Sequence, residues 1–262
     1  MERYKSASTG SHGLLGEALV SRLEQANNKV FRLGRDGVIP EGLNVVFDCA
    51  AFGNLAGHRG DPKEIYKANL MRVITEMDYL DDKTKYIYIS SSSVARPTQI
   101  TYSLSKKAAE EFLQIQDKKI AIVRPFSMTG IGDQPEHLIP TLIRSCLKGE
   151  EMPFVPEPHH DYIDVDDVVD ALLIIADKGL FEGEVYQVGR GKSYSNQEVR
   201  EMVENATGKK ANVQLVESMR SYDSTDWVSD NTRIWSLGWK ITKSLEQTIQ
   251  EMVNYARKNI TD

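Results

Sequence analysis

The sequence predicts an α/β protein built on a doubly wound parallel sheet, and three observations lead to this prediction. Short apolar runs alternate with amphipathic segments of helical periodicity through the first half of the chain. The apolar runs are continuous, which is typical of strands that helices cover on both faces. A glycine-rich turn, 10-GSHGLLG-16, opens the first amphipathic segment, as at the start of a βαβ unit.

The elements of the first half follow one another in βαβ order. Residues 3–8 (RYKSAS) take the place of the first strand, although they are polar where a buried central strand is expected to be apolar. The other predicted strands are 30–33, 45–51, 85–90 and 119–125, and the predicted helices are 14–23, 65–77 and 103–115.

The second half of the chain mixes loop-like segments with further helices. Residues 126–136 are loop-like, and residues 151–158 are rich in proline. Helices are predicted at 138–147, 166–177 and 244–258, and a strand at 184–189. We predict a larger sheet domain over 1–125 plus about 160–190, and a smaller domain over about 126–159 and 191–262.

Composition and charge argue against several classes of protein. The formal net charge is −6, and no block of Lys and Arg indicates a nucleic-acid or membrane surface. No apolar run approaches the roughly 20 residues of a membrane span, and no signal-peptide pattern is present. The two cysteines, Cys49 and Cys146, fit a reducing compartment, and no His/Cys cluster indicates a metal. We expect a cytoplasmic protein without a metal, a nucleic-acid partner or a membrane association.

The glycine-rich turn predicts a dinucleotide site of the Rossmann type. Gly10, Gly13 and Gly16 would allow a tight turn, a close backbone approach to a diphosphate, and close packing of helix on sheet. The N-terminus of the helix that follows would face the phosphate charge.

The end of the second predicted strand indicates which dinucleotide binds. Gly34 stands where an NAD site usually has an acidic residue for the ribose hydroxyls. Arg35 follows and can pair with a 2′-phosphate, and His12 can add a donor. These residues favour NADP, while Asp36 keeps NAD open as the alternative.

Seven segments occur in an order that resembles a known family. They are TGSHGLLG, VVFDCAA, Asn69 within a helix, YIYISSSSV, Tyr102-x-x-x-Lys106, IVRPFSMTG and HDYIDVDDVVDALL. This order resembles the extended short-chain dehydrogenase/reductases, in particular the NAD(P)-dependent nucleotide-sugar epimerase/dehydratase/reductase group. The resemblance implies a Rossmann-type fold with a smaller C-terminal substrate-binding α/β domain and a nucleotide-sugar substrate. It also implies a homodimer formed through helices near 61–80 and 103–115. The family usually has a strand and a helix where only about nine residues separate Arg35 from the strand at Val45, so we expect the third strand of the sheet to be missing or vestigial.

Tyr102 and Lys106 stand one helical turn apart and form a candidate acid/base pair. A free tyrosine has a pKa of about 10, and we predict that Lys106 and an oxidised nicotinamide lower it. The resemblance implies that Lys106 also holds the nicotinamide ribose and that a serine binds the reacting substrate oxygen. The family pattern before Val94 selects Ser91 for this role, with Ser92 as the alternative.

The resemblance extends to the residues that would contact the two ligands. The implied cofactor contacts are Gly10, Ser11, His12, Gly13, Leu14, Leu15, Gly16, Arg35, Ala50, Ala51, Phe52, Asn69, Tyr102, Lys106, Pro125 and Phe126. The implied substrate contacts are Ser92, Ser127, His137 and Arg220.

The resemblance also narrows the reaction. Dehydratases of the group carry an Asp-Glu pair where this chain has Ser92 and Ser93, so dehydration is not expected. We predict a 4-ketoreductase that acts on a 4-keto-6-deoxy sugar carried by a nucleotide diphosphate. A nucleotide-sugar 4-epimerase with a transiently reduced cofactor is the alternative, and a non-catalytic NADP-binding sensor or interaction protein on the same fold is the alternative of another class.

Overall fold

A computed structural model of the 262-residue chain describes all residues except 1–4, 35–36, 54–60, 97–99, 218–226 and 261–262. The chain divides into two compact units. The first comprises Met1–Pro125, Val168–Val188 and Asn231–Trp239, and the second comprises Phe126–Asp167, Gly189–Asp230 and Lys240–Asp262. Residues 231–239, which the sequence groups with the smaller domain, therefore pack with the first unit, where Ile234 and Trp239 are buried.

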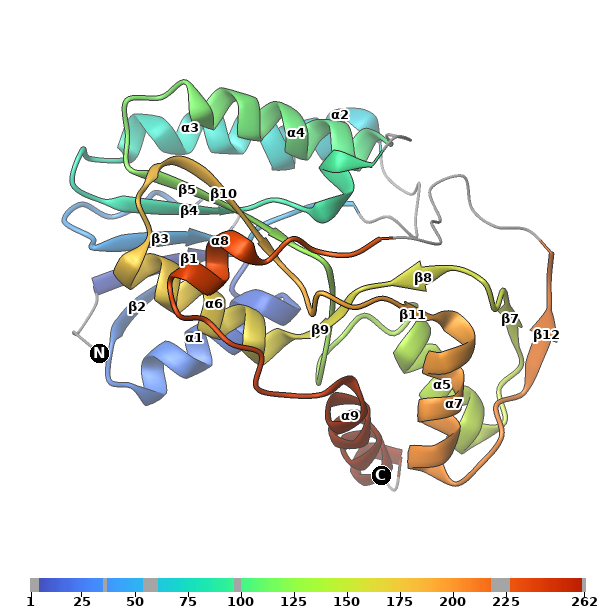
Figure 1. The fold of residues 1–262 in the computed structure, drawn as a ribbon. Coiled ribbons are helices and arrows are strands. Elements are labelled where there is room, and N and C mark those ends of the chain that lie inside the picture. Colours follow the sequence, from blue (N-terminus) through green and yellow to red (C-terminus); the bar gives the residue numbers. More distant parts are fainter. Residues whose placement is uncertain (1–4, 35–36, 54–60, 97–99, 218–226, 261–262) are drawn as a thin grey trace. The chain divides into compact units, whose positions relative to one another are not determined.

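The first unit contains a six-stranded parallel sheet, which confirms the predicted fold class (Figure 1). Its strands are β1 (Lys5–Thr9), β2 (Lys29–Leu33), β3 (Val45–Asp48), β4 (Lys85–Ile89), β5 (Ile120–Pro125) and β10 (Glu182–Val188). They lie in the order β10-β5-β4-β3-β1-β2, and every neighbouring pair is parallel. β2 is the edge strand, and the described residues between β2 and β3 form no strand. The third strand is therefore missing from the described part of the chain, as predicted.

Helices cover both faces of this sheet (Figure 1). One face carries a continuous helical segment made of α2 (Pro62–Tyr66), a π-helical turn (Lys67–Met71) and α3 (Arg72–Tyr79), together with α4 (Thr101–Gln114). The other face carries α1 (Leu14–Gln25) and α6 (Val165–Lys178). A 3₁₀ turn (Ser92–Ala95) follows β4, and the short α8 (Thr232–Ser236) packs against β10.

The first strand is buried in spite of its polar sequence. β1 lies between β2 and β3, and Ser6, Ala7, Ser8 and Thr9 are all buried. Two of the hydroxyls find partners inside the unit, since Ser8 donates to the Thr9 carbonyl and Thr9 donates to Asp48. Small side chains and a full set of ladder hydrogen bonds on both edges allow a polar segment to serve as a central strand.

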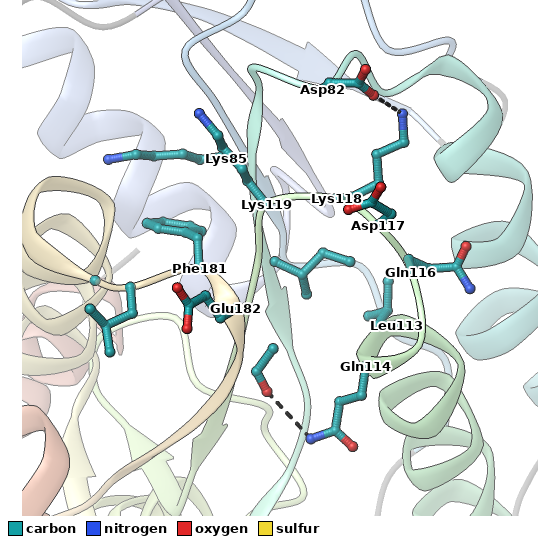
Figure 2. Close-up of a pocket in the computed structure, with 14 residues that line it drawn as sticks. Asp82, Lys85, Leu113, Gln114, Gln116, Asp117, Lys118, Lys119, Phe181 and Glu182 are labelled. Carbon is teal, nitrogen blue, oxygen red and sulfur yellow. Dashed lines mark hydrogen bonds and ion pairs between the residues drawn. The ribbon is translucent and has the colours of Figure 1, made fainter.

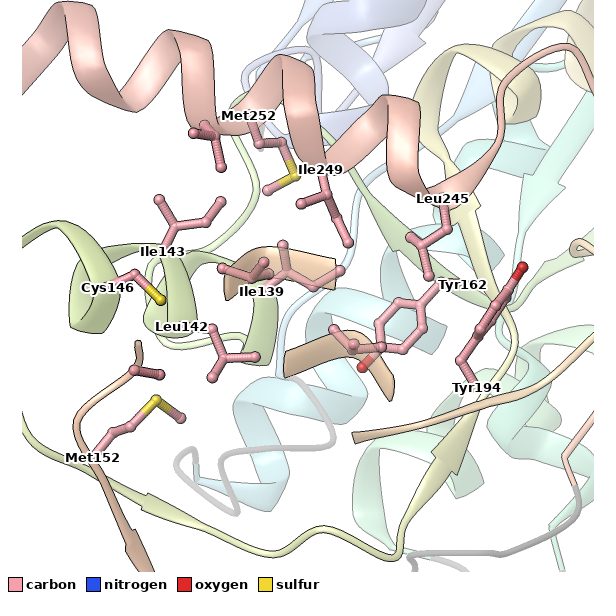
Figure 3. Packing of buried hydrophobic residues seen from close by; sticks show 14 of the residues in the cluster. Ile139, Leu142, Ile143, Cys146, Met152, Tyr162, Tyr194, Leu245, Ile249 and Met252 are labelled. Carbon is pink, nitrogen blue, oxygen red and sulfur yellow. The ribbon is translucent and has the colours of Figure 1, made fainter. Parts of the chain in front are cut away.

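The second unit packs three helices and three pairs of short strands around its own core. The helices are α5 (Leu138–Lys148), α7 (Asn196–Thr207) and α9 (Leu245–Ile260). The strands pair as β6 (Ser127–Thr129) with β9 (Tyr162–Asp164), β7 (Met152–Phe154) with β12 (Val213–Leu215), and β8 (His159–His160) with β11 (Tyr194–Ser195). Figure 3 shows Ile249 and Met252 of α9 beside Ile139 and Ile143 of α5. The strand β6 lies within 126–136, where the sequence predicts a loop.

Helix length and polarity bear on membrane association. Among the described residues, no helix is both long enough and apolar enough to cross a membrane.

Candidate active site

Three segments with predicted roles follow the carboxyl ends of neighbouring strands of the sheet. The glycine turn follows β1, residues 49–52 follow β3, and Ser90–Ser93 follow β4. Parallel strands end at the same edge, which is where ligands bind in open α/β sheets. The fold therefore gathers these segments at one edge of the first unit.

The glycine turn is tightly built. Gly10 has a φ of +59°, and a Cβ there would lie 2.7 Å from backbone atoms of Cys49 and Ala50. A Cβ at Gly16 would overlap the Gly10 carbonyl oxygen. A Cβ at Gly13 would meet that oxygen at 3.4 Å and no other close atom of the described residues. Gly10 and Gly16 thus close the turn, while Gly13 has room for a Cβ.

The turn and the start of α1 fit an anionic group such as a diphosphate. Gly13 is the N-cap of α1, and no side chain in the described part of the chain caps this end. The first amides of a helix are donors that need partners, and the helix dipole favours negative charge there. Ser11 adds a hydroxyl that is buried without a partner among the described residues. His12 is exposed, whereas the side chain of Leu15 is buried in the unit.

The segment after β3 is held by Asn69. The Asn69 side chain accepts a hydrogen bond from the Phe52 amide at 2.8 Å and donates to the Phe52 carbonyl at 2.9 Å. It also donates to the Ser105 hydroxyl on α4 at 2.9 Å. Asn69 is among the residues predicted to contact the cofactor, but its side chain is fully buried and engaged in these bonds. It positions the segment, and the partly or fully exposed Ala50, Ala51 and Phe52 form its outer surface.

Ser91 and Tyr102 are brought together as the sequence predicts. The Ser91 hydroxyl caps the 3₁₀ turn by accepting a hydrogen bond from the Ser93 amide at 3.2 Å. It also lies 2.9 Å from the Ser93 hydroxyl. Tyr102 lies in the first turn of α4, close enough to the Ser91 side chain for that hydroxyl to lower the pKa of its phenol. This contact supports Ser91 rather than the buried Ser92 as the partner of Tyr102.

Lys106 lies one turn after Tyr102 but faces the end of β4. Its side chain is 1% exposed, its Nζ donates to the Ile89 carbonyl at 2.7 Å, and the Nζ lies 4.7 Å from the Tyr88 ring centroid. Burial lowers the pKa of Lys106 to about 8, although the negative charge of Asp48 opposes this change.

The protein's own groups raise the pKa of Tyr102, so Lys106 does not by itself produce the predicted lowering. Burial raises the pKa of Tyr102 to about 12, and the hydrogen bond with Ser91 opposes this rise. The ammonium of Lys106 is directed to the Ile89 carbonyl, so desolvation dominates at the phenol.

The remaining predicted residues come from the carboxyl end of β5 and from the second unit. Pro125 ends β5, and the second unit holds Phe126, Ser127 of β6, and His137, the N-cap of α5. The His137 Nδ1 atom lies 2.7 Å from an Asp133 carboxylate oxygen. Arg35 and Arg220 lie outside the described residues.

Sequence reasoning missed a buried polar cluster beside the site. Asp48 at the end of β3 contacts Thr9, Arg72 and Tyr86, and Glu76 contacts Arg72 and Tyr86. A carboxylate that ends the apolar run 45-VVFD-48 was the available signal, since buried acids need partners. The described residues contain no group of His, Cys, Asp and Glu suited to a metal.

A groove at the opposite edge of the sheet is separate from these residues. It has a volume of about 650 Å³ and lies where β4, β5 and β10 begin. Figure 2 shows Lys118 paired with Asp82 across 2.7 Å, and Lys85 beside Phe181. Lys85 donates a hydrogen bond to the Ala176 carbonyl, so Lys85 and Lys118 are both engaged in contacts that stabilise the surrounding structure.

Comparison with known proteins places the chain among relatives of similar fold. The chain is 29% identical over 161 residues to the low-salt glycan biosynthesis protein Agl12 of Haloferax volcanii, a match that covers 59% of this chain and 51% of that protein. The chain thus spans about half the length of this curated relative.

Two solved structures share the fold over nearly the whole chain. MoeE5, solved in complex with UDP-glucose and NAD, is 22% identical, with a TM-score of 0.88 and coverage of 98% of this chain and 99% of that one. RMD from Pseudomonas aeruginosa, complexed with NADPH, is 19% identical, with a TM-score of 0.84 and coverage of 97% and 99%. At these identities the likeness concerns the fold.

A family match identifies the chain more closely. Residues 36–189 match the NAD dependent epimerase/dehydratase family. The matched stretch is more than half of the chain and includes Ser91, Tyr102 and Lys106, so the chain belongs to the NAD dependent epimerase/dehydratase family.

Proposed function

We propose that the protein is an NAD(P)H-dependent oxidoreductase that reduces the 4-keto group of a 4-keto-6-deoxy sugar carried by a nucleotide diphosphate. The observation that carries this proposal is the contact between Ser91 and Tyr102 beside the buried Lys106. In support, a solved structure of the same fold contains UDP-glucose and NAD.

The chain's own residues account for the proton that the reduction needs. A reduced nicotinamide supplies the hydride that the carbonyl carbon accepts. Tyr102 then gives its hydroxyl proton to the carbonyl oxygen, while the Ser91 hydroxyl binds the same oxygen. A Tyr102 pKa of about 12 keeps the phenol protonated at neutral pH, which is the form that a reductase needs. A preference for NADP would favour the reductase over the 4-epimerase, because only the reductase consumes a reduced cofactor.

The first unit offers a place for the dinucleotide. We propose that the glycine turn and the uncapped start of α1 hold its diphosphate, with Ser11 as a further donor. We propose NADP over NAD because Gly34 leaves open space at the end of β2, where an acidic side chain would repel a 2′-phosphate. Structures of this fold hold either NAD or NADPH, so both cofactors belong in the test.

The decisive experiment is a panel of nucleotide-linked 4-keto-6-deoxy sugars tested with NADPH and NADH. We expect cofactor oxidation with at least one sugar. Tyr102→Phe should lower kcat by about 10²- to 10⁴-fold and leave the Kd for NADPH unchanged, because it removes only the proton donor. The matched control is Tyr79→Phe at an exposed tyrosine, which should keep the wild-type rate.

Other outcomes would select the alternatives. Interconversion of C4 epimers without net cofactor oxidation would identify a 4-epimerase. Cofactor binding without turnover of any sugar would favour a non-catalytic NADP-binding protein. A Tyr102→Phe variant with the wild-type rate would overturn the assignment of the proton donor.

A further inference from the structure

We propose that Asp48 and Arg72 are a pair of positioning residues that fix the glycine turn and the segment 49–52 and place opposing charges beside Lys106. This inference rests on the proposed function, since it assigns these residues to the binding of the dinucleotide and to the state of Lys106.

Asp48 is the hub of the buried cluster. Its carboxylate is fully buried at the end of β3 and accepts hydrogen bonds from Thr9 and from the Tyr86 hydroxyl, the latter at 2.9 Å. The two guanidinium nitrogens of Arg72 lie 2.8 and 2.9 Å from its two oxygens. This bidentate arrangement fixes the orientation of the carboxylate as well as its charge.

Asp48 is linked to the glycine turn through Thr9. The Thr9 hydroxyl donates to Asp48 and accepts from the Ala50 amide at 3.1 Å. Thr9 immediately precedes Gly10, whose Cα packs against the backbone of Cys49 and Ala50. A shift of the Asp48 carboxylate therefore moves both the turn and the segment after β3.

Arg72 fixes the same segment from the helical side. Its Nε donates to the Ala68 carbonyl at 3.0 Å within the π-helical turn. Asn69 of that turn holds the amide and carbonyl of Phe52. Single π-helical turns occur frequently at functional sites, and here the turn lets Asn69 and Arg72 reach both ends of one short segment.

The pair also acts on Lys106 with opposite signs, since Asp48 lies opposite Tyr88 in the β3–β4 ladder and the Lys106 Nζ lies 4.7 Å from the centroid of the Tyr88 ring. The negative charge of Asp48 favours the protonated ammonium, and the positive charge of Arg72 disfavours it. Cys49 and Glu110 also favour protonation, and the Tyr88 ring faces the ammonium. Neutralising Asp48 and neutralising Arg72 should therefore change the pKa of Lys106 in opposite directions.

Glu76 supplies a matched control within the same cluster. It pairs with Arg72, and its carboxyl oxygen lies 2.5 Å from the Tyr86 hydroxyl, but it has no hydrogen bond to the segment 49–52 among the described residues. Burial and the charge of Asp48 raise the pKa of Glu76 to about 7, although the charge of Arg72 and the hydrogen bond with Tyr86 act to lower it. Glu76→Gln therefore perturbs the cluster without removing its link to the site.

Two measurements on the full chain test the proposal. The first is the Kd for NADPH and NADH by fluorescence, and the second is the pKa of Lys106 by NMR of labelled lysine, assigned by the loss of its signal in Lys106→Met. Neither requires a sugar substrate. Thermal unfolding of each variant reports whether it folds.

The expected results differ between the variants. Asp48→Asn and Arg72→Gln should each weaken NADPH binding by about tenfold or more, because the binding segments lose their fixed geometry. Asp48→Asn should lower the pKa of Lys106 by about 1, and Arg72→Gln should raise it by a similar amount. Glu76→Gln should leave the affinity and the pKa close to those of the wild type.

Thr9→Val keeps the test valid if a charge variant fails to fold. It removes the hydroxyl link without changing charge, and should weaken NADPH binding while leaving the pKa of Lys106 unchanged. Wild-type affinity in Asp48→Asn, Arg72→Gln or Thr9→Val, or pKa changes of the same sign in both charge variants, would overturn the inference. A wild-type protein that binds neither dinucleotide would instead refute the proposed function, and the NMR measurement would then decide the electrostatic part alone.

Discussion

At the scale of single residues, the glycines of the turn after β1 have different structural roles. Gly10 adopts a left-handed backbone conformation and packs against the backbone of Cys49 and Ala50. Gly13 has an ordinary extended backbone conformation and has room for a Cβ. The sequence treats the glycines as one motif, whereas the structure assigns Gly10 to the fold and Gly13 to the approach of a ligand.

Two alanine substitutions should separate these roles. Gly10→Ala should destabilise the protein by about 2 kcal/mol or more, because a Cβ there strains the backbone and meets fixed atoms. Gly13→Ala should cost at most about 1 kcal/mol of helix capping, yet weaken NADPH binding by about tenfold or more, because its methyl group occupies the space that a diphosphate approaches. Calorimetry and fluorescence titration measure the two effects. Unchanged NADPH affinity in Gly13→Ala would contradict the proposed role of the turn.

At the scale of elements, β1 shows how a polar segment becomes a central strand. Its place in the sheet follows from the order of elements and from the glycine turn, since its own composition does not indicate a buried strand. Ser8 and Thr9 find acceptors, but the Ser6 hydroxyl is buried without a partner among the described residues.

This difference predicts opposite effects on stability. Ser6→Ala should raise the free energy of unfolding by about 1 kcal/mol, because it removes a buried hydroxyl that lacks a hydrogen bond. Thr9→Val should lower it by about 1 to 3 kcal/mol, because the Ala50 amide loses the Thr9 hydroxyl as acceptor and Asp48 loses one of its donors. Urea unfolding followed by circular dichroism gives both values. A destabilised Ser6→Ala would show that this hydroxyl has a partner, such as an ordered water.

At the scale of the whole molecule, the homodimer stays a prediction. Exposed apolar residues on one helical face of the first unit support it. Met71 of the π-helical turn and Leu104 of α4 are 52% and 43% exposed, and these two helical elements are in contact. Both belong to the helices through which the family resemblance implies a dimer. Large exposed apolar side chains on neighbouring helices are typical of a surface that a partner covers.

The dimer has a direct test by mass. The wild-type protein should sediment at twice the chain mass of 29.5 kDa. Leu104→Glu should give the monomer mass, because it places a charge in the apolar face. The control is Ile115→Glu, at an exposed apolar residue that caps the end of α4, which should remain dimeric. A monomeric wild-type protein would refute the predicted dimer.

The sequence by itself determined the features that depend on local spacing. The alternation of strands and helices, the glycine turn, the missing third strand and the four-residue step from Tyr102 to Lys106 are all visible in the order of residues. Helical and strand periodicity and the turn chemistry of glycine fix such features over short distances along the chain.

Only the tertiary structure decided how these residues are surrounded. The Asp48 cluster draws its members from β1, β3, β4 and α3, and no local pattern could join them. Asn69 became a positioning residue because its helix lies over the segment after β3, and the Tyr102 pKa rises because the fold withdraws the half-buried phenol from water. Burial and long-range contact set hydrogen-bond partners and the cost of charge, and both depend on residues far apart in the sequence.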